Sequence, residues 1–344
     1  STTTYYESDP TAQPAALGGR TLAEIKENVA TWYTYHRRRR HVATNAIGLV
    51  TEDNPKFRYG LSVINDEYKL FKEIPTDPDA DLPANAESVY NALRDFEWPG
   101  HGTPLIEGLD RTGRYYQDGA LTGKNEPIIN ECQKNYTVLF TDGFYNDNDG
   151  GGNGDADGDG ATDTLADTAY KYYETDLNTN LANDVPTTDA DQATHQHMNT
   201  FTVAFGLDGT LEDTDGDGWP NPELDKSDLW GGDPQSNCPS KACAFKVDDM
   251  WHAAYNSAGT FVSADTPAEV TQAIREALAT VSARQSSAAS LSVNTQSVST
   301  DTGIFQATFR ASDWSGQFKR LSINEVSVGE RSRRIGRVTD DGML

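Results

Sequence analysis

The chain has 344 residues and a formal net charge of −25, with 53 acidic against 28 basic side chains. This acidity argues against nucleic acid and anionic membranes as partners, because both repel a negative protein, and it suits divalent cations. No apolar run is long enough for a transmembrane helix, so we expect no membrane insertion. The length allows one large α/β domain with an appended segment.

The N-terminal region begins with residues 1–20, which show no hydrophobic periodicity and are predicted to form an arm. Thr21 and Glu24 have the spacing of a capping box, which predicts a helix start. The arginines at 37–40 are expected to continue this helix and to pair with carboxylates. A stripe at helical spacing is expected to pack in the core: Ile25, Val29, Trp32, Tyr33 and His36.

Strands and helices then alternate along the chain. The pattern of residues 57–65 predicts a strand, with residues 68–74 as its edge partner. Residues 88–98 and a segment that begins at Pro104 are predicted helices. Further helices are expected at 164–175, 247–257 and 267–282, and further strands at 200–205 and 260–263.

The central strand contains Val138, Leu139 and Phe140, an apolar run without polar alternation that predicts burial on both faces. Asp142 follows at the carboxyl end of the strand, where parallel sheets bind ligands. The strand and helix order over residues 21–283 predicts an α/β domain with a doubly wound, Rossmann-like sheet. Residues 284–344 are rich in Ser, Thr, Val and Gln, which predicts a β-rich linker and the start of a C-terminal β module.

Two acidic segments carry the pattern Asp-x-Asp-x-Asp-Gly, inside predicted insertions at about 144–163 and 207–245. Oxygen ligands at positions one, three, five and nine, with a carbonyl at seven, are typical of a calcium loop. The predicted ligands of the first loop are Asp155, Asp157, Asp159, Asp163 and the carbonyl of Ala161. Those of the second loop are Asp213, Asp215, Asp217, Asn221, the carbonyl of Trp219 and, further on, Asp225.

Both loops lack the bidentate acid that is usual at position twelve of such a loop. Ala166 and Leu224 occupy that position, while Asp167 and Asp225 come one residue later. The alternative is a disordered acidic segment that binds no ion. Because the same spacing occurs twice, the sequence favours calcium.

The three cysteines and a pair of histidines complete the local signals. Cys238 and Cys243 lie in a turn-rich segment and predict a disulfide in an exported protein. Cys132 is expected to be either a buried free thiol or bonded to a partner outside this chain. His195 and His197 could serve a metal, but without a third ligand nearby we expect both at the surface.

Thr103 precedes a predicted helix and Asp142 ends the central strand, so both fall at the carboxyl rim of the sheet, where we expect them close together. This pair resembles part of the metal-ion-dependent adhesion site of von Willebrand factor A domains, which implies Mg²⁺. That site also uses a strand ending in Asp-x-Ser-x-Ser. The sequence contains no such motif, so we expect this rim site to be empty or weak.

Several segments, taken in order, resemble the PilY family of type IV pilus-associated tip adhesins. The resemblance spans about residues 28–320 and implies a von Willebrand A domain followed by a calcium-binding β-propeller. The segments are Ala30-Thr-Trp-Tyr-Thr-Tyr-His-Arg, Phe57-Arg-Tyr-Gly-Leu, Gly102-Thr-Pro-Leu, Cys132-Gln-Lys-Asn-Tyr with Thr141-Asp-Gly, Phe305-Gln-Ala-Thr-Phe-Arg, and Asp313-Trp-Ser-Gly-Gln.

The resemblance implies an exported protein at the cell surface or pilus tip. Its partners would be pilus subunits such as minor pilins, or a ligand on a host or other surface. Because the sequence has no nucleophile elbow, phosphate loop or zinc motif, we do not expect an enzyme. The alternatives are a surface-layer or filament component braced by calcium and, less favoured, a secreted calcium-dependent hydrolase.

Overall fold

The computed structural model describes most of the chain, and everything below refers to those residues. The described ranges are 20–36, 38–65, 70–77, 79–97, 102–117, 120–121, 123–146, 152–238, 242–285, 289–293, 303–310, 315–326 and 335–343.

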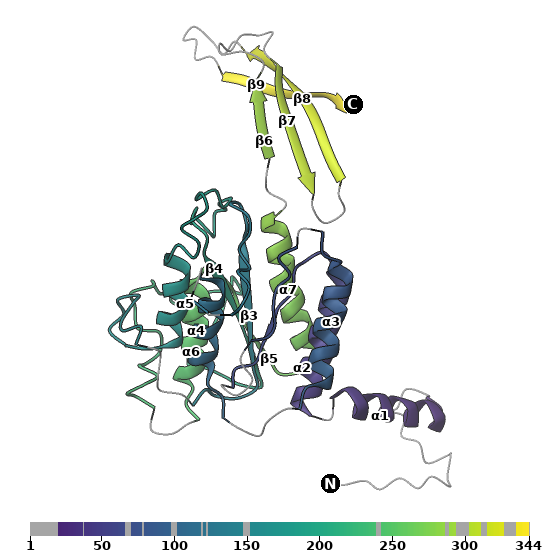
Figure 1. Ribbon diagram of the computed structural model, residues 1–344, viewed down its shortest axis with the longest axis vertical. Helices are drawn as coiled ribbons and strands as arrows, with labels where there is room; N and C mark the ends of the chain where they lie inside the picture. The colour runs from purple at the N-terminus through teal and green to yellow at the C-terminus, as the bar shows by residue number, and fades with distance from the viewer. Residues whose placement is uncertain are drawn as a thin grey trace.

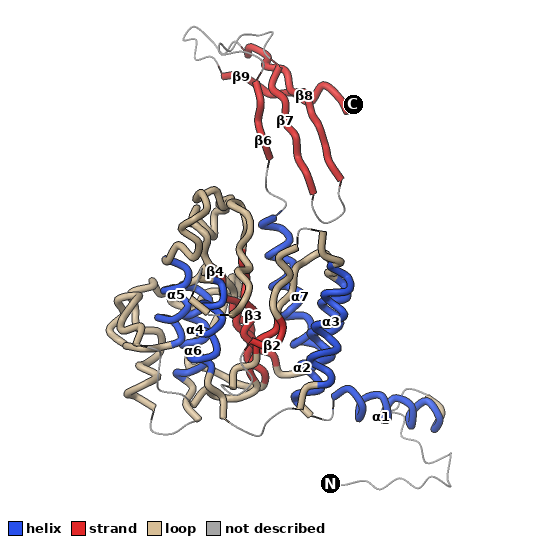
Figure 2. Tube along the Cα trace, in the orientation of Figure 1, coloured by secondary structure: helices blue, strands red, loops and turns tan. Residues whose placement is uncertain are grey.

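The described residues form seven helices, three parallel strands, a short hairpin and an antiparallel sheet (Figure 2). The helices are α1 (Leu22–His36), α2 (Arg39–Asp53), α3 (Leu82–Asp95), α4 (Leu105–Tyr116), α5 (Leu165–Glu174), α6 (Phe245–Asn256) and α7 (Pro267–Gln285). The strands are β1 (Leu61–Ser62), β2 (Leu70–Lys72), β3 (Asn135–Thr141), β4 (Met198–Phe205), β5 (Phe261–Ala264), β6 (Ala289–Val293), β7 (Gly303–Arg310), β8 (Ser315–Val326) and β9 (Ile335–Met343).

A parallel sheet in the order β3-β4-β5 forms the middle of the α/β part. Asn135 of β3 pairs with Met198 of β4, and Thr202 of β4 pairs with Phe261 of β5. Helix α5 connects β3 to β4, and α6 connects β4 to β5. An α/β fold with a parallel sheet is therefore confirmed. Because the strands are parallel, the segments that follow β3 and β4 both start at the carboxyl edge of the sheet.

Helices cover both faces of this sheet (Figure 1). The first core cluster joins α4, α5 and α6 to one face, where Leu139 and Ala204 are buried. The second joins α2 and α7 to the other face, where Val203 and Phe205 are buried. Neighbouring residues of β4 thus serve opposite cores, as expected for a strand, and every residue of β4 is buried.

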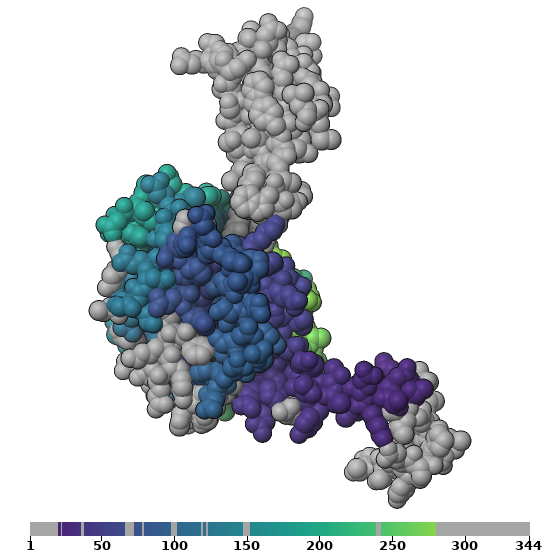
Figure 3. Space-filling view, turned by 45° about the vertical axis from the view of Figure 1, so that its right-hand side comes forward, coloured from purple at the N-terminus to yellow at the C-terminus, as the bar shows by residue number. Residues whose placement is uncertain are grey.

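Helix α1 starts where the sequence predicted, but its apolar stripe is not in the core. The capping box is present: the backbone N–H of Thr21 donates to the Glu24 carboxylate at 2.6 Å, and that of Glu24 donates to Oγ1 of Thr21 at 3.3 Å. The side chains of Val29, Trp32 and Tyr33 are 55 to 59% exposed, so the prediction of core packing is wrong. Figure 3 shows α1 projecting from the rest of the molecule.

The prediction that the arginines extend α1 is also wrong. Arg38 has an extended backbone (φ −136°, ψ 148°), and a separate helix, α2, begins at Arg39. Arg37 lies outside the described residues. Helix α2, which the sequence analysis did not separate from α1, buries Val42, Ala46 and Val50 against α7 and the sheet.

Two predicted strands differ in extent or burial. The strand expected at 57–65 is reduced to β1, which pairs antiparallel with β2 as the predicted edge partner. Strand β3 has the predicted position, but only Asn135, Leu139 and Thr141 are fully buried. Its partial exposure follows from its place at one end of the described sheet order.

Beyond α7 the described chain forms an antiparallel sheet with the order β6-β7-β8-β9. The β-rich character expected there is therefore present. The described residues include no helix that is long and apolar enough to cross a membrane.

The contrast between β4 and α1 gives a stability prediction. Phe201→Ala should lower the free energy of unfolding by about 3–5 kcal/mol, because it empties a fully buried site. Trp32→Ser should change it by less than about 0.5 kcal/mol, because the indole is largely exposed. Urea unfolding followed by far-UV circular dichroism measures both, and equal losses would contradict the exposed position of α1.

Candidate metal centre

The first acidic loop lies between β3 and α5 and has the turn pattern of a calcium loop. The Asp155 carboxylate accepts the backbone N–H of Gly160 at 3.2 Å, and the Asp159 carboxylate accepts that of Ala161 at 2.7 Å. Gly160 has φ +91°, a value that a glycine adopts without strain. These bonds curl the backbone so that the carboxylates turn toward the inside of the loop.

Asp167 adds a third carboxylate to those of Asp155 and Asp157. One ligand atom from each of Asp155, Asp157 and Asp167 lies within 4.8 Å of the others. The Asp167 carboxylate also accepts the backbone N–H groups of Ala156, at 2.6 Å, and Thr164, at 2.9 Å. Asp167, at position thirteen of the loop and on the first turn of α5, therefore lies where the acid at position twelve of a typical calcium loop would lie.

The other predicted ligands of the first loop have different surroundings. Oδ1 of Asp163 accepts the backbone N–H of Gly154 at 2.8 Å, and Asp163 has φ +56°. Its side chain thus closes the base of the loop. Ala161 is buried, with its N–H held by Asp159.

Helix α6 contributes two side chains to the first loop. Nδ2 of Asn256 donates to the Asp157 carboxylate at 2.6 Å. The ring of His252 lies 3.6 Å from Oδ2 of Asp157 and 3.7 Å from Oδ2 of Asp159. His252 and Asn256 are four residues apart and so share one face of the helix. The sequence analysis missed both, because nothing local indicates which face of a distant helix meets the loop.

Burial and mutual repulsion raise the pKa values of two carboxyl groups in the first loop, Asp157 and Asp159. Burial, together with the charges of Asp159 and Asp167, raises the pKa of Asp157 to about 7. Burial likewise raises the pKa of Asp159 to about 6, with Asp167 and Asp155 adding to the effect. A divalent cation among these groups would offset the repulsion, so the group Asp155, Asp157 and Asp167 fits a hard cation such as calcium.

The second acidic loop, between β4 and α6, repeats the same turns. The Asp213 carboxylate accepts the backbone N–H of Gly218 at 2.9 Å, and the Asp217 carboxylate accepts that of Trp219 at 2.9 Å. One ligand atom from each of Asp213, Asp215 and Asp217 lies within 4.8 Å of the others, but all three residues are exposed. Two similar backbone turns thus present their carboxylates in different environments.

The outer ligands of the second loop are used differently. Oδ1 of Asn221 accepts the N–H of Thr214 at 2.6 Å, while Nδ2 of Asn221 donates to the Asp215 carboxylate at 3.3 Å. The carbonyl of Asp225 accepts Nε1 of Trp230 at 3.1 Å. Asp225 does not join the cluster of the other three aspartates within the described chain.

The described residues of the segment from 206 to 244 are attached at several places to α6 or to the residues just before it. The attachment points are Thr210 to Asp248, Gly218 to Trp251, Lys226 to His252, Trp230 to His252, and Cys238 to Cys243 just before the helix. The Trp230 and His252 rings are stacked, with centroids 4.8 Å apart. The aromatic ring of Trp219 meets that of Tyr255 edge-on, with centroids 4.5 Å apart. Helix α6 is therefore the common support of both acidic loops.

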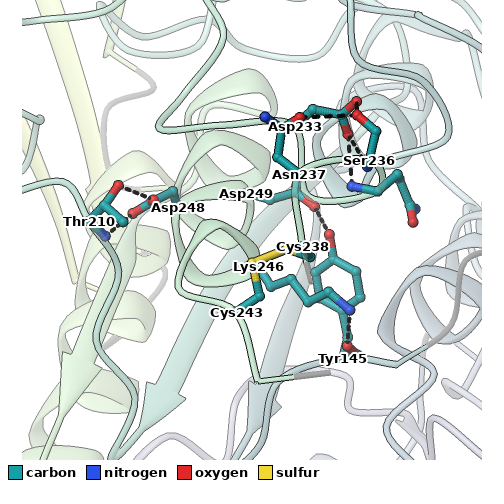
Figure 4. The surroundings of a disulfide bond; sticks show 11 residues. Tyr145, Thr210, Asp233, Ser236, Asn237, Cys238, Cys243, Lys246, Asp248 and Asp249 are labelled. Atoms are coloured by element: carbon teal, nitrogen blue, oxygen red, sulfur yellow. Dashed lines mark hydrogen bonds between the residues drawn. A yellow bond between two sulfur atoms is a disulfide. The ribbon is translucent and has the colours of Figure 1, made fainter. Parts of the chain in front are cut away.

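The first turns of α6 hold the neighbouring segments through buried charged groups (Figure 4). The Asp249 carboxylate accepts the Tyr145 hydroxyl at 2.5 Å and the backbone N–H groups of Leu165 and Ala166, each at 3.0 Å. Nζ of Lys246 donates to the carbonyl of Tyr145 at 2.7 Å. Burial raises the pKa of Asp249 to about 7. These contacts fix the start of α5, and hence Asp167, relative to α6.

The predicted disulfide between Cys238 and Cys243 is present, with Cα atoms 5.6 Å apart. It closes a short ring immediately before α6, as Figure 4 shows. Cys132 is a free thiol and is exposed, so the expectation of a buried thiol is wrong.

The sequence predicted that the two histidines before β4 lie at the surface, and this prediction is wrong. His197 is 1% exposed, and its Nε2 lies 3.1 Å from Oδ2 of the buried Asp191. The Tyr173 hydroxyl also donates to Asp191, at 3.1 Å. His195 is partly buried, with Nε2 2.8 Å from the carbonyl of Tyr173. This arrangement anchors the segment before β4 to α5.

At the carboxyl edge of the sheet, Thr103 lies beside the turn that contains Asp142. Oγ1 of Thr103 is 3.5 Å from the position that a Cβ atom would occupy at Gly143. The guanidinium of Arg39 donates to the carbonyl of Asp142. Within the described ranges, Asp142 belongs to no cluster of three carboxylate, histidine or cysteine ligand atoms. Among the described residues, the two predicted rim residues are thus neighbours that join no cluster of three metal-ligating side chains.

The raised carboxyl pKa values predict how stability depends on pH in the absence of metal. Asp157, Asp159 and Asp249 have pKa values of about 6 to 7 in the folded chain, against about 3.9 for an unperturbed Asp. Between these values the folded chain binds more protons than the unfolded chain, so stability should fall as pH rises from about 4 to 7.

His252 makes stability rise with pH instead, because burial lowers its pKa to about 4 in the folded chain. Between about pH 4 and 6.5 the imidazole of the unfolded chain is therefore protonated more often than that of the folded chain. One imidazole does not outweigh three carboxyl groups, so a net fall remains. Urea unfolding in EDTA at pH 5 and pH 7.5 measures the difference. A higher free energy of unfolding at pH 7.5 would contradict the crowding of these carboxyl groups.

Comparison with known proteins gives matches that cover most of this chain. It is 28% identical over 353 residues to the type IV pilus biogenesis factor PilY1 of Pseudomonas aeruginosa strain UCBPP-PA14, covering 88% of this chain. The PilY1 proteins of strains PAK and PAO1 are 26% and 27% identical over similar spans. The chain spans about 30% of the length of these relatives. No protein-family model and no solved structure matches it. The three matches support a PilY-family assignment, as the sequence motifs indicated.

Proposed function

We propose that this chain is part of a pilus-associated surface protein that serves type IV pilus biogenesis and adhesion and is not an enzyme. The observation that carries this proposal is the similarity to PilY1 across 88% of the chain. The proposed location is extracellular, at the cell surface or the pilus tip. The proposed partners are pilus subunits such as minor pilins, or a ligand on a host or other surface.

The α/β part, residues 21–283, would be the partner-binding unit, with a von Willebrand A-like fold. Supporting this is the order of parallel strands with helices on both faces, and the placement of Thr103 beside the Asp142 turn at the carboxyl edge. A rim ion, Mg²⁺ if a strand ending in Asp-x-Ser-x-Ser is present, would take a carboxylate from the partner. Residues 284–344 would begin the following β module.

Calcium would act as a brace in the two acidic loops. The first loop supplies Asp155, Asp157 and Asp167, and the second supplies Asp213, Asp215 and Asp217. Both loops rest on α6, so an ion in either would stiffen segments that emerge from the same edge of the sheet. Such bracing would keep the partner-binding edge in shape outside the cell.

The pilus role is tested by deletion of the gene in the bacterium that encodes this chain. Surface pili, counted by electron microscopy, should decrease, and the intact gene supplied on a plasmid should restore them. A gene with Asp155→Asn and Asp157→Asn should restore fewer pili. Normal pili and normal surface attachment after deletion would contradict the proposal.

Calcium bracing is tested on the 344-residue chain by thermal unfolding and calorimetry. Calcium at 100 times its dissociation constant should add about 2.7 kcal/mol per site to the free energy of unfolding. Asp155→Asn should remove the contribution of the first loop, and Asp213→Asn that of the second. Asp142→Ala is the matched control and should leave both contributions in place. Loss of calcium binding in Asp142→Ala alone would reject the division between rim and loops.

A further inference from the structure

A second cluster of ligand atoms lies on the buried side of the first acidic loop. One ligand atom from each of Asp157, Asp159 and His252 lies within 4.8 Å of the others. We propose that these three side chains bind a divalent transition metal, with Zn²⁺ as the best fit. This site would be distinct from the all-oxygen group of Asp155, Asp157 and Asp167, with which it shares only Asp157.

The hydrogen bonding of His252 leaves one ring nitrogen for a metal. Nε2 lies 3.0 Å from the carbonyl of Lys226, and because a carbonyl only accepts, Nε2 carries the hydrogen. In the neutral ring the lone pair is then on Nδ1, which faces Oδ2 of Asp159 at 3.7 Å. Two acceptors that face each other are stabilised by a proton, a donating water or a cation between them, and a metal ion is the one of these that would also use the Asp157 carboxylate. Histidines that bind metals typically donate their other N–H to a carbonyl or carboxylate in this way.

The distances suit one ion. Two ligand atoms about 2.1 Å from a metal and 3.7 Å apart subtend an angle of roughly 120° at the metal, somewhat wider than the tetrahedral angle of about 109°. Oδ2 of Asp157 lies 3.6 Å from Nε2 of the same ring, and one ligand atom from each of the three residues lies within 4.8 Å of the others, so the Asp157 carboxylate is near enough to be the third ligand. Three protein ligands leave a fourth position for water, a common arrangement for zinc.

The site is built into the protein interior rather than on its surface. The side chains of Asp157, Asp159 and His252 are 0%, 4% and 2% exposed. The stacked ring of Trp230, itself 2% exposed, holds the imidazole in place. On the next turn of α6, Oδ1 of Asn256 is buried and makes no hydrogen bond among the described residues, so an acceptor stands ready for the metal-bound water.

The nitrogen ligand decides the class of metal. Calcium and magnesium are hard cations that take oxygen ligands, whereas imidazole favours zinc and its transition-metal neighbours. The zinc site does not depend on the calcium brace proposed above, because His252 is a predicted ligand of neither calcium loop. Asp159 is also a predicted ligand of the first calcium loop, so His252 is the residue that distinguishes the two sites. Either site can therefore fail without the other.

The test uses the untagged 344-residue chain after removal of metal with a chelator. Zn²⁺ should bind with one-to-one stoichiometry by calorimetry. Co²⁺ should give a visible absorption band that Zn²⁺ abolishes and that excess Ca²⁺ leaves in place. Bound Co²⁺ should also quench tryptophan fluorescence, because Trp230 is stacked on the ligand ring.

Two variants each remove one ligand of this site, and His252→Gln removes the one that no calcium loop is predicted to use. His252→Gln and Asp159→Asn should each weaken Zn²⁺ binding at least ~100-fold, more than the loss typical of an outer-shell partner. His195→Gln, which alters a histidine outside both loops, is the matched control and should bind Zn²⁺ as the wild type does. Asp155→Asn should lose the calcium bound in the first loop and keep the Co²⁺ band. Circular dichroism shows whether each variant folds. If one of His252→Gln and Asp159→Asn does not fold, the Zn²⁺ affinity of the other tests the proposal.

The proposal is overturned if the wild-type chain gives no Co²⁺ band with stoichiometric metal. It is also overturned if folded His252→Gln or Asp159→Asn binds Zn²⁺ as tightly as the wild type. Calcium binding without zinc binding would leave the calcium brace standing and reject the second site. Zinc binding without calcium binding would support the second site and reject the calcium brace.

Discussion

Buried polar groups must form hydrogen bonds or ion pairs, and many of the buried polar groups of this chain lie on α6. Lys246, Asp248, Asp249, His252 and Asn256 are all buried on this one helix. Removing a partner from a buried charge typically costs several kcal/mol, so each of these residues dictates the position of the segment it contacts. Helix α6 therefore packs against the sheet and also holds, through its polar side chains, the segments that follow β3 and β4.

The two acidic loops show how the same local sequence acquires different properties from its surroundings. Both have the same aspartate turns, as the bonds from Gly160 to Asp155 and from Gly218 to Asp213 illustrate. The first loop is pressed between α5 and α6, where burial makes uncompensated carboxylates unfavourable. The second is exposed, and solvent screens its charges. A cation therefore relieves far more repulsion in the first loop than in the second.

Features set by residues close together in the chain could be predicted from the sequence, whereas contacts between distant segments could not. The capping box at Thr21, the parallel strands and the Cys238–Cys243 disulfide follow from spacing along the chain. The exposure of Trp32 could not be predicted, because an apolar stripe shows that a helix has a face and not what covers it. Asp167 had a weak signal, one place beyond its usual position. His252 had none, since its contact with the loop arises only from the packing of α6.

The regular attachment of residues 206–244 to α6 also determines how this segment opens. Among the described residues 206–238, the contacts at Thr210, Gly218, Lys226, Trp230 and Cys238 leave at most seven residues between successive contact points. Loss of one contact releases a small loop whose ends stay close together, so the entropy gained is limited and reclosure is quick. We therefore expect the described part of the segment to open in small local steps while α6 stays folded. A long excursion from the sheet can in this way be solvent-facing and still resist a protease, which needs an extended stretch of chain to cut.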